Sequence, residues 1–415
     1  MTTATAAPTI KVYSYRWVVL LAYMFISLMM QVLWICYAPI TKVASETLGV
    51  SDMEIGLLAM LFMYIFIPLA LPASWLIDTW GFKKAVSLGA IMMAVFGLLR
   101  GIFTQNYTLT LIMTVGLAVA QPLLLNSGTK LVANWFRLEE RATVVGLGGL
   151  ASLLGVVIGQ IATPMMLEVW GLRGAMLVYG ILSMASALLF VVLAKEHPPT
   201  PAGHEERVLM LDGLKRILSM RDFYLLAFVF FVINAIFNGI STWVEVIVRP
   251  KGLDISQAGL IGGLLMIGGI LGFLIFSTAS DRLRRRRSVV MAAALLSIPF
   301  LVLLPNVSGF VTLAIVAFLL GLCVLGGYPV ILQYATEICY PAPEGTSQGV
   351  LMLAGQISVV AVTAMGWSNE VHGSFTPSLL VFAGSMAVGV VMVSIMKESK
   401  LIQAAQHAES TKAGS

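Results

Sequence analysis

Polar and aromatic side chains recur inside otherwise apolar stretches of this sequence, and their types and spacing suit ligand binding. Gln31, Trp34 and Tyr37 repeat every three residues, so they would share one face of a helix. Trp34 and Phe237 are separated by 203 residues, and an internal repeat of that period would place their rings on opposite walls of a cavity. Such rings attract a cation that lacks N–H donors, and a flat heteroaromatic ring would also fit. The alternative is that both rings only fill space between helices.

Amide side chains complete the candidate binding site, because a polar group at bilayer depth normally faces a cavity or another helix. The expected binding residues are Gln31, Trp34, Tyr37, Gln121, Asn126, Phe237, Asn238 and Gln356. Glu245 is the one acid expected well inside an apolar stretch, four residues before Arg249. An i, i+4 ion pair explains it, and a proton or cation relay is the rival hypothesis. Without a buried carboxylate pair near the midplane, facilitated diffusion is the preferred mode.

A second motif combines an acid with basic residues directly after an apolar stretch. Asp78 is followed by Lys83 and Lys84, and the pattern returns as Asp281 and Arg282 before a run of arginines. A carboxylate at a helix end can pair with basic groups and helix N-termini of a neighbouring half only when that side is closed. We therefore expect these five residues to act in gating. Simple anchoring of the loops by positive charge is the alternative.

The composition requires a membrane. Hydrophobic residues make up 59% of the chain, charged residues 11%, and the mean hydropathy is +0.94. A spanning helix needs roughly 20 largely apolar residues, and the sequence offers twelve such stretches between Trp17 and Ile395. The lipid bilayer and a small-molecule substrate are the expected partners, with no nucleic acid, and the chain is expected to be a monomer.

Enzymatic chemistry is not expected. The four histidines fall in predicted loops or tails, and the three cysteines lack metal-ligand spacing. No catalytic residue, metal or cofactor is therefore expected.

The distribution of basic residues predicts the orientation. Most of the 25 lysines and arginines fall on the side of the N-terminus, which places both termini in the cytoplasm of a multi-pass inner-membrane or plasma-membrane protein. The basic residues expected outside are Lys42, Arg100, Arg173, Arg249 and Lys251.

An internal repeat divides the chain into halves. Asp281 follows Asp78 by 203 residues, and Glu140, Thr143 and Gly146 correspond to Glu344, Thr346 and Gly349 at nearly the same offset. The expected fold is therefore all-α, with twelve transmembrane helices in two pseudo-symmetric six-helix bundles around a midplane site. The expected parts are a cytoplasmic tail (1–16), an N-terminal bundle (17–194), a cytoplasmic linker (195–221), a C-terminal bundle (222–397) and a second tail (398–415).

These motifs resemble known transporters. The Asp78 loop is similar to the signature between helices 2 and 3 of the major facilitator superfamily. Within it, the chain resembles solute carrier family 49, the feline leukaemia virus subgroup C receptor-related transporters. The matching stretches are LWICYAPI (33–40), PLALPASWLIDTWG (68–81), AQPLLLNSGTKLVANWF (120–136), FNGIST (237–242) and EICYPAPEGTSQG (337–349).

The resemblance implies the major facilitator fold and transport of choline, ethanolamine, haem or pyridoxine. In choline-transporting members a Trp, a Tyr and two Gln line the site. Trp34, Gln121 and Gln356 look like three of these, whereas the Tyr position falls on Asn238.

The leading hypothesis is an alternating-access transporter, as a facilitated uniporter, for a small organic cation or vitamin-like metabolite. Haem or drug efflux is the alternative, followed by a receptor or sensor that does not transport.

Overall fold

The computed structural model describes residues 13–199, 215, 217–340, 344–396 and 398. The expected tails and linker therefore lie largely outside the described residues, as do the side chains of Glu344 and Thr346. The N-terminal elements are α1 (Arg16–Ile35), η1 (Ala38–Ile40), α2 (Thr41–Leu48), α3 (Asp52–Trp80), α4 (Phe82–Ile102), α5 (Tyr107–Leu125), α6 (Gly128–Trp135) and α7 (Leu138–Leu193). The C-terminal elements are α9 (Arg221–Val248), η2 (Arg249–Lys251), α10 (Ile255–Leu283), α11 (Arg286–Asn306), α12 (Phe310–Cys339), α13 (Glu344–Gln356), α14 (Val359–His372) and α15 (Thr376–Ile395).

Twelve membrane spans are present, as the sequence predicts. Eleven helical segments of the described chain are long and apolar enough to cross a bilayer, and one of them, 143–193, has 51 residues. At 1.5 Å per residue it would extend about 77 Å, more than twice a hydrocarbon core of roughly 30 Å. Gly171, with φ 65° and ψ 177°, interrupts the helical backbone inside α7. The segment therefore consists of two spans joined at Gly171.

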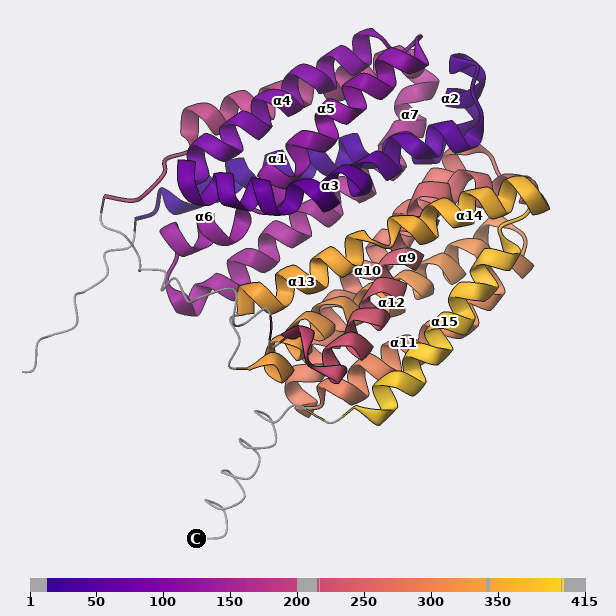
Figure 1. The fold of residues 1–415 in the computed structure, drawn as a ribbon. Helices are drawn as coiled ribbons and strands as arrows, with labels where there is room; N and C mark the ends of the chain where they lie inside the picture. The colour runs from indigo at the N-terminus through magenta and orange to yellow at the C-terminus, as the bar shows by residue number, and fades with distance from the viewer. Residues whose placement is uncertain (1–12, 200–214, 216, 341–343, 397, 399–415) are drawn as a thin grey trace, which may run out of the picture.

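The helices form two groups. Elements α1–α7 and α9–α15 lie side by side in Figure 1, indigo to magenta and rose to yellow respectively, and we call them the N-half and the C-half. Glycines bring helices together within a half. A Cβ at Gly272 of α10 would lie 2.0 Å from the Leu322 carbonyl oxygen, and one at Gly321 of α12 only 1.8 Å from that of Leu265. Such small-residue faces let membrane helices pack backbone to backbone.

Two of the spans are interrupted near their middle. Helix α1 ends at Ile35 and continues through η1, where Pro39 has no N–H for the helical pattern. The span made of α13 and α14 breaks between Gln356 and Val359. In transporters, interrupted helices commonly line the substrate site.

An even number of spans returns the chain to the end at which it started. We call the end of the bundle at Arg16 and Ile395 the termini end, and the opposite end, where α3 begins and α9 ends, the far end.

Candidate functional site

The two aromatic residues picked out by the 203-residue offset meet between the halves. The Trp34 ring of α1 and the Phe237 ring of α9 have centroids 6.3 Å apart and an interplanar angle of 44°. Trp34 is 5% exposed, and its Nε1 donates to the Ala59 oxygen of α3 at 3.1 Å. The prediction of opposite cavity walls is wrong for this conformation, because rings this close leave no room for a ligand between them. They pack against each other at the contact between α1 and α9.

Two of the predicted amides are free to bind a ligand. Gln121 of α5 is 7% exposed and Gln356 of α13 is half-buried, and neither side chain hydrogen-bonds to a described residue. Gln356 directly precedes the break between α13 and α14. Asn238 is engaged at the same break, where its Nδ2 donates to the Ser358 hydroxyl at 3.2 Å. Asn238 is therefore a bracing residue in this conformation, in the position where the family resemblance has a tyrosine.

The remaining predicted binding residues have other surroundings. Asn126 donates to the Ala70 oxygen and the Ser74 hydroxyl, each at 3.2 Å, and so ties the end of α5 to α3. Gln31 keeps a buried Oε1 without a hydrogen-bond partner among the described residues. Tyr37 lies beyond the end of α1, with its ring beside the Arg100 guanidinium at 5.3 Å. Its backbone still has right-handed helical angles, φ −81° and ψ −22°, so a common face of Tyr37 with Gln31 and Trp34 stays a prediction.

Two cavities accompany these residues. One of about 10 Å³ lies beside Phe237 within the C-half, which is space for about one water molecule. A larger one of about 150 Å³ lies at the far end and is lined in part by Lys251, Asn369 and Phe375. That larger cavity begins beside Val246 of α9, further towards the far end than Phe237.

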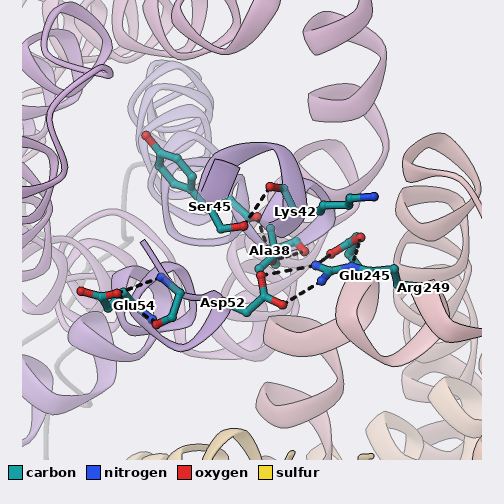
Figure 2. Close-up of polar contacts among 10 residues, drawn as sticks. Ala38, Lys42, Ser45, Asp52, Glu54, Glu245 and Arg249 are labelled. Carbon is teal, nitrogen blue, oxygen red and sulfur yellow. Dashed lines mark hydrogen bonds and ion pairs between the residues drawn. The ribbon is translucent and has the colours of Figure 1, made fainter. Parts of the chain in front are cut away.

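An ionic cluster joins the halves at the far end (Figure 2). Arg249 Nη1 of the C-half lies 2.8 Å from Asp52 Oδ2 of the N-half. The same guanidinium binds Glu245 through Nε at 2.9 Å and Nη2 at 2.5 Å. The predicted pair of Glu245 and Arg249 is therefore present, and Glu245 is only 3% exposed. Asp52, which the sequence analysis missed, makes this pair a contact between the halves.

The start of α3 is built to hold Asp52 in place. Ser51 and Glu54 form a reciprocal capping box, in which each side chain accepts from the other residue's backbone N–H. The Tyr107 hydroxyl donates to the Glu54 carbonyl oxygen at 3.0 Å. These contacts fix the first turn of α3 and so the carboxylate that faces Arg249.

An indole seals the interface next to this cluster. Trp243 is 1% exposed, and its Nε1 donates to the Val362 oxygen of α14 at 3.1 Å. Its six-membered ring covers Gly56 of α3, where a Cβ would lie 2.2 Å from Cη2, and it also packs on Gly366 of α14, where a Cβ would lie 2.5 Å from Cζ2. Deeper in the interface, Gln160 Nε2 of α7 donates to the Ser241 oxygen of α9 at 2.9 Å. The halves are thus closely joined towards the far end.

At the termini end, the predicted gating acids pair within their own halves. Asp78 binds Lys130 at 2.9 Å, and Asp281 binds Arg286 at 2.5 Å. The backbone N–H groups of Phe82 and Lys83 donate to Glu196, a helix cap that the sequence analysis missed. Neither the Lys84 side chain nor the exposed Arg282 side chain forms an ion pair or hydrogen bond with another described residue.

Charge pairing at the termini end continues on α7 and α12. The Arg16 guanidinium, hydrogen-bonded to Glu140 at 2.5 Å, holds the pKa of that carboxyl below its ordinary value. Glu337, an acid inside α12 that is 8% exposed, accepts from Arg286 Nε at 3.1 Å. The prediction that Glu245 is the one acid well inside a span is therefore wrong. Among the described residues no three His, Cys, Asp or Glu side chains gather in a way that would hold a metal ion.

Arg100 is a buried basic residue. The sequence predicts it on the outer side of the membrane, and it lies in the last turn of α4 at the far end, where it is 1% exposed. Its burial was not predicted, because a hydropathy average hides one charge near the end of a long apolar run.

Comparisons with known proteins agree with this architecture. The family model described as Major Facilitator Superfamily matches residues 19–363 and 245–404. Solute carrier family 49 member A3 of Xenopus tropicalis is 29% identical over 368 residues, covering 84% of this chain and 76% of that protein. The choline/ethanolamine transporter FLVCR1 of Felis catus is 25% identical over 427 residues, covering 95% and 75%.

A solved structure shares the fold. It is a bacterial homologue of the human lysosomal transporter Spinster in an inward-facing, unoccupied conformation, with a TM-score of 0.71 at 15% identity. The alignment covers 93% of this chain and 96% of that one.

Proposed function

The chain belongs to the major facilitator superfamily of membrane transporters, and we propose that it carries a small organic cation or vitamin-like metabolite such as choline, ethanolamine or pyridoxine. The observation that carries this proposal is the contact of Trp34 and Phe237 across the two halves. A ligand that binds both rings binds both halves, so its occupancy is coupled to their rocking motion. Relatives named as choline/ethanolamine transporters support the same class of substrate.

The chemistry of the site favours this class. Ring faces attract a cation within about 6 Å of their centroids, and Trp34 and Phe237 bring two rings together at the contact between the halves. Gln121 and Gln356, which have no described partner, supply amide oxygens for a cation or amide N–H groups for a hydroxyl. Gln31 contributes a further unpartnered amide oxygen.

The positive-inside rule gives the orientation: the termini end of the bundle and both termini lie on the cytoplasmic side. The membrane is an inner or plasma membrane. The far-end contacts of Arg249, Trp243 and Gln160 then close the outside, which corresponds to an inward-facing state. The similarity to a transporter solved in an inward-facing conformation supports this assignment. The 17–194 and 222–397 bundles move as the two rocking units of a monomer.

The gating acids act in the opposite state. When the termini end closes, Asp78 and Asp281 exchange their partners Lys130 and Arg286 for groups of the other half. Lys83, Lys84 and Arg282 are the basic groups at the same level of the bundle. The far-end cluster opens as this latch forms, so the two gates alternate.

Binding is tested by thermal-shift titration of the purified protein with choline, ethanolamine, pyridoxine and haemin. We expect one of the first three to raise the Tm, and Trp34→Ala to weaken its binding about tenfold through the lost ring contact. Trp75→Ala is the matched control, because Trp75 is 65% exposed on α3. Stabilisation by haemin alone, or equal affinity in Trp34→Ala, would refute the proposal.

Transport is expected to be uniport, without proton or sodium coupling. Both buried acids of the described chain, Glu245 and Glu337, are hydrogen-bonded to arginines and belong to different ends of the bundle, so they do not form a carboxylate pair at the midplane. Counterflow of the bound substrate in proteoliposomes at clamped membrane potential should be the same with and without a pH gradient or sodium. Acceleration by a proton gradient that a protonophore abolishes would show coupling instead.

A further inference from the structure

Arg100 is a buried charge that none of the preceding mechanism uses. Its side chain lies in α4, 1% exposed, and no carboxylate of the described residues lies within 4 Å of it. A buried guanidinium without a counter-ion is costly, and in a membrane span such a residue commonly has a functional role. The groups that it contacts show what that role is.

All its described partners belong to the interruption of the first span. Nη2 donates to the Leu33 carbonyl oxygen at 2.9 Å and to Cys36 Sγ at 3.3 Å. The guanidinium also lies 5.3 Å from the Tyr37 ring centroid. These residues surround the last turn of α1, which ends at Ile35.

The helix break creates the need for this cation. Cys36 N–H still binds the Val32 oxygen, but the described backbone bonds do not include one from Tyr37 N–H to Leu33. The last carbonyls of a helix carry partial negative charge and need donors. Arg100, in the last turn of α4, supplies the donor and the positive charge at this buried point.

Trp34 is held from both sides by this arrangement. Its backbone neighbour Leu33 is bound by Arg100, while its own indole N–H is bound by the Ala59 oxygen. The Trp34 ring itself is in contact with the Phe237 ring. A shift of the broken end of α1 would therefore turn the ring out of that contact.

We propose that Arg100 is a positioning residue for the substrate site: its guanidinium is a tethered cation that caps the broken end of α1 and fixes Trp34. In transporters with interrupted helices, such C-terminal half-helix ends bind the coupling cation. Here a side chain occupies that position, so no mobile ion is required. The inference rests on the proposed function only in taking Trp34 to contact the substrate.

The test is chemical rescue of Arg100→Ala. Hydrogen–deuterium exchange of residues 33–40 and substrate counterflow are measured with and without about 20 mM guanidinium chloride. We expect faster exchange at the break and a KM at least tenfold higher in the variant. Guanidinium should reverse both changes at least in part, whereas equal NaCl should not.

Two further variants keep the test decisive if Arg100→Ala does not fold. Arg100→Met removes a buried charge at similar length, so its Tm should be no lower than that of the native protein while KM rises at least tenfold. Arg100→Lys retains a cation and should stay within about threefold of native KM. Arg286→Ala, at the termini end, is the control that guanidinium should not restore.

The outcomes of these experiments distinguish the role of Arg100 from the proposed substrate class. Native exchange in Arg100→Ala, recovery with NaCl equal to that with guanidinium, or an unchanged KM in Arg100→Met would overturn the role of Arg100. If the native protein transports none of the compounds tested, the proposed substrate class fails, and the exchange measurement still decides whether Arg100 holds the break.

Discussion

Gly56→Leu is expected to abolish transport by holding the far end open. Even a Cβ at Gly56 would lie 2.2 Å from Trp243 Cη2. The indole is held in place, because its N–H is bound to Val362 and its ring also packs closely on Gly366. A side chain at position 56 must therefore push the halves apart. We expect counterflow to fall at least about a hundredfold, which corresponds to about 3 kcal/mol against closure.

Opening is measured by labelling a cysteine introduced at Ser241 with a membrane-impermeant thiol reagent applied from outside. Ser241 is fully buried at the interface, and the native cysteines are buried. Labelling should be slow in the native background and fast with Gly56→Leu. The control is Gly384→Leu, because Gly384 is helical with nothing within 4 Å of its Cβ position.

A compensating change tests the assignment to one contact. Trp243→Ala in the Gly56→Leu background removes the indole that collides with the new side chain, so transport should recover in part and labelling should slow. A double variant as inactive and as open as Gly56→Leu would show that the leucine acts elsewhere. Non-additivity of this kind is the mark of a direct contact.

Much of the fold could be predicted because the bilayer leaves few alternatives. Every backbone group in the hydrocarbon must be hydrogen-bonded, so long apolar runs become helices and their count gives the number of spans. The repeat between Asp78 and Asp281 then indicates two halves. The join at Gly171 needed the structure, because a glycine in an apolar run also occurs inside continuous helices.

The residues of the candidate site were easier to propose from the sequence than the contacts that each of them makes. The 203-residue offset identifies Trp34 and Phe237 as equivalent positions, and they do meet. The offset does not tell which conformation the two halves adopt, and in this conformation the two rings are in contact. The contact of Tyr37 with Arg100 was not predicted, because it joins two spans and helical spacing describes only one.

Contacts between the halves lay beyond prediction. Asp52 and Arg249 are 197 residues apart, and a pair at this separation is set by the register of two rigid bundles. The pair of Glu245 and Arg249 was predictable, since it depends only on helical spacing. Sequence patterns therefore predicted the part of the far-end cluster within α9 and missed the part that joins the two halves.

Arg249→Met is expected to be the most damaging single charge removal at the far end. The native guanidinium binds Asp52 and Glu245 together, and the Glu245 side chain is 4% exposed. Without Arg249 two carboxylates on opposite halves face each other with no cation between them. Leaving a buried charge unpaired costs about 3–5 kcal/mol, enough to reverse the balance between closed and open states. Counterflow should fall at least about thirtyfold and labelling at Ser241 should rise.

The order of the variants identifies the mechanism. Asp52→Asn leaves the pair of Glu245 and Arg249 intact and should lower transport only about threefold. Adding Asp52→Asn to Arg249→Met removes one of the two repelling charges, so the double variant should transport better than Arg249→Met alone. Arg249→Lys should be intermediate, because one ammonium cannot reproduce the two-sided binding of the guanidinium.

The control for charge alone is Arg173→Met, since Arg173 is exposed and, like Arg249, expected outside. It should leave counterflow and labelling unchanged. If Arg249→Met transported normally, or if Asp52→Asn worsened it, the cluster would be a surface ion pair without a gating role. Recovery in the double variant is the result that a purely local folding defect at the end of α9 would not produce, because Asp52 belongs to the other half.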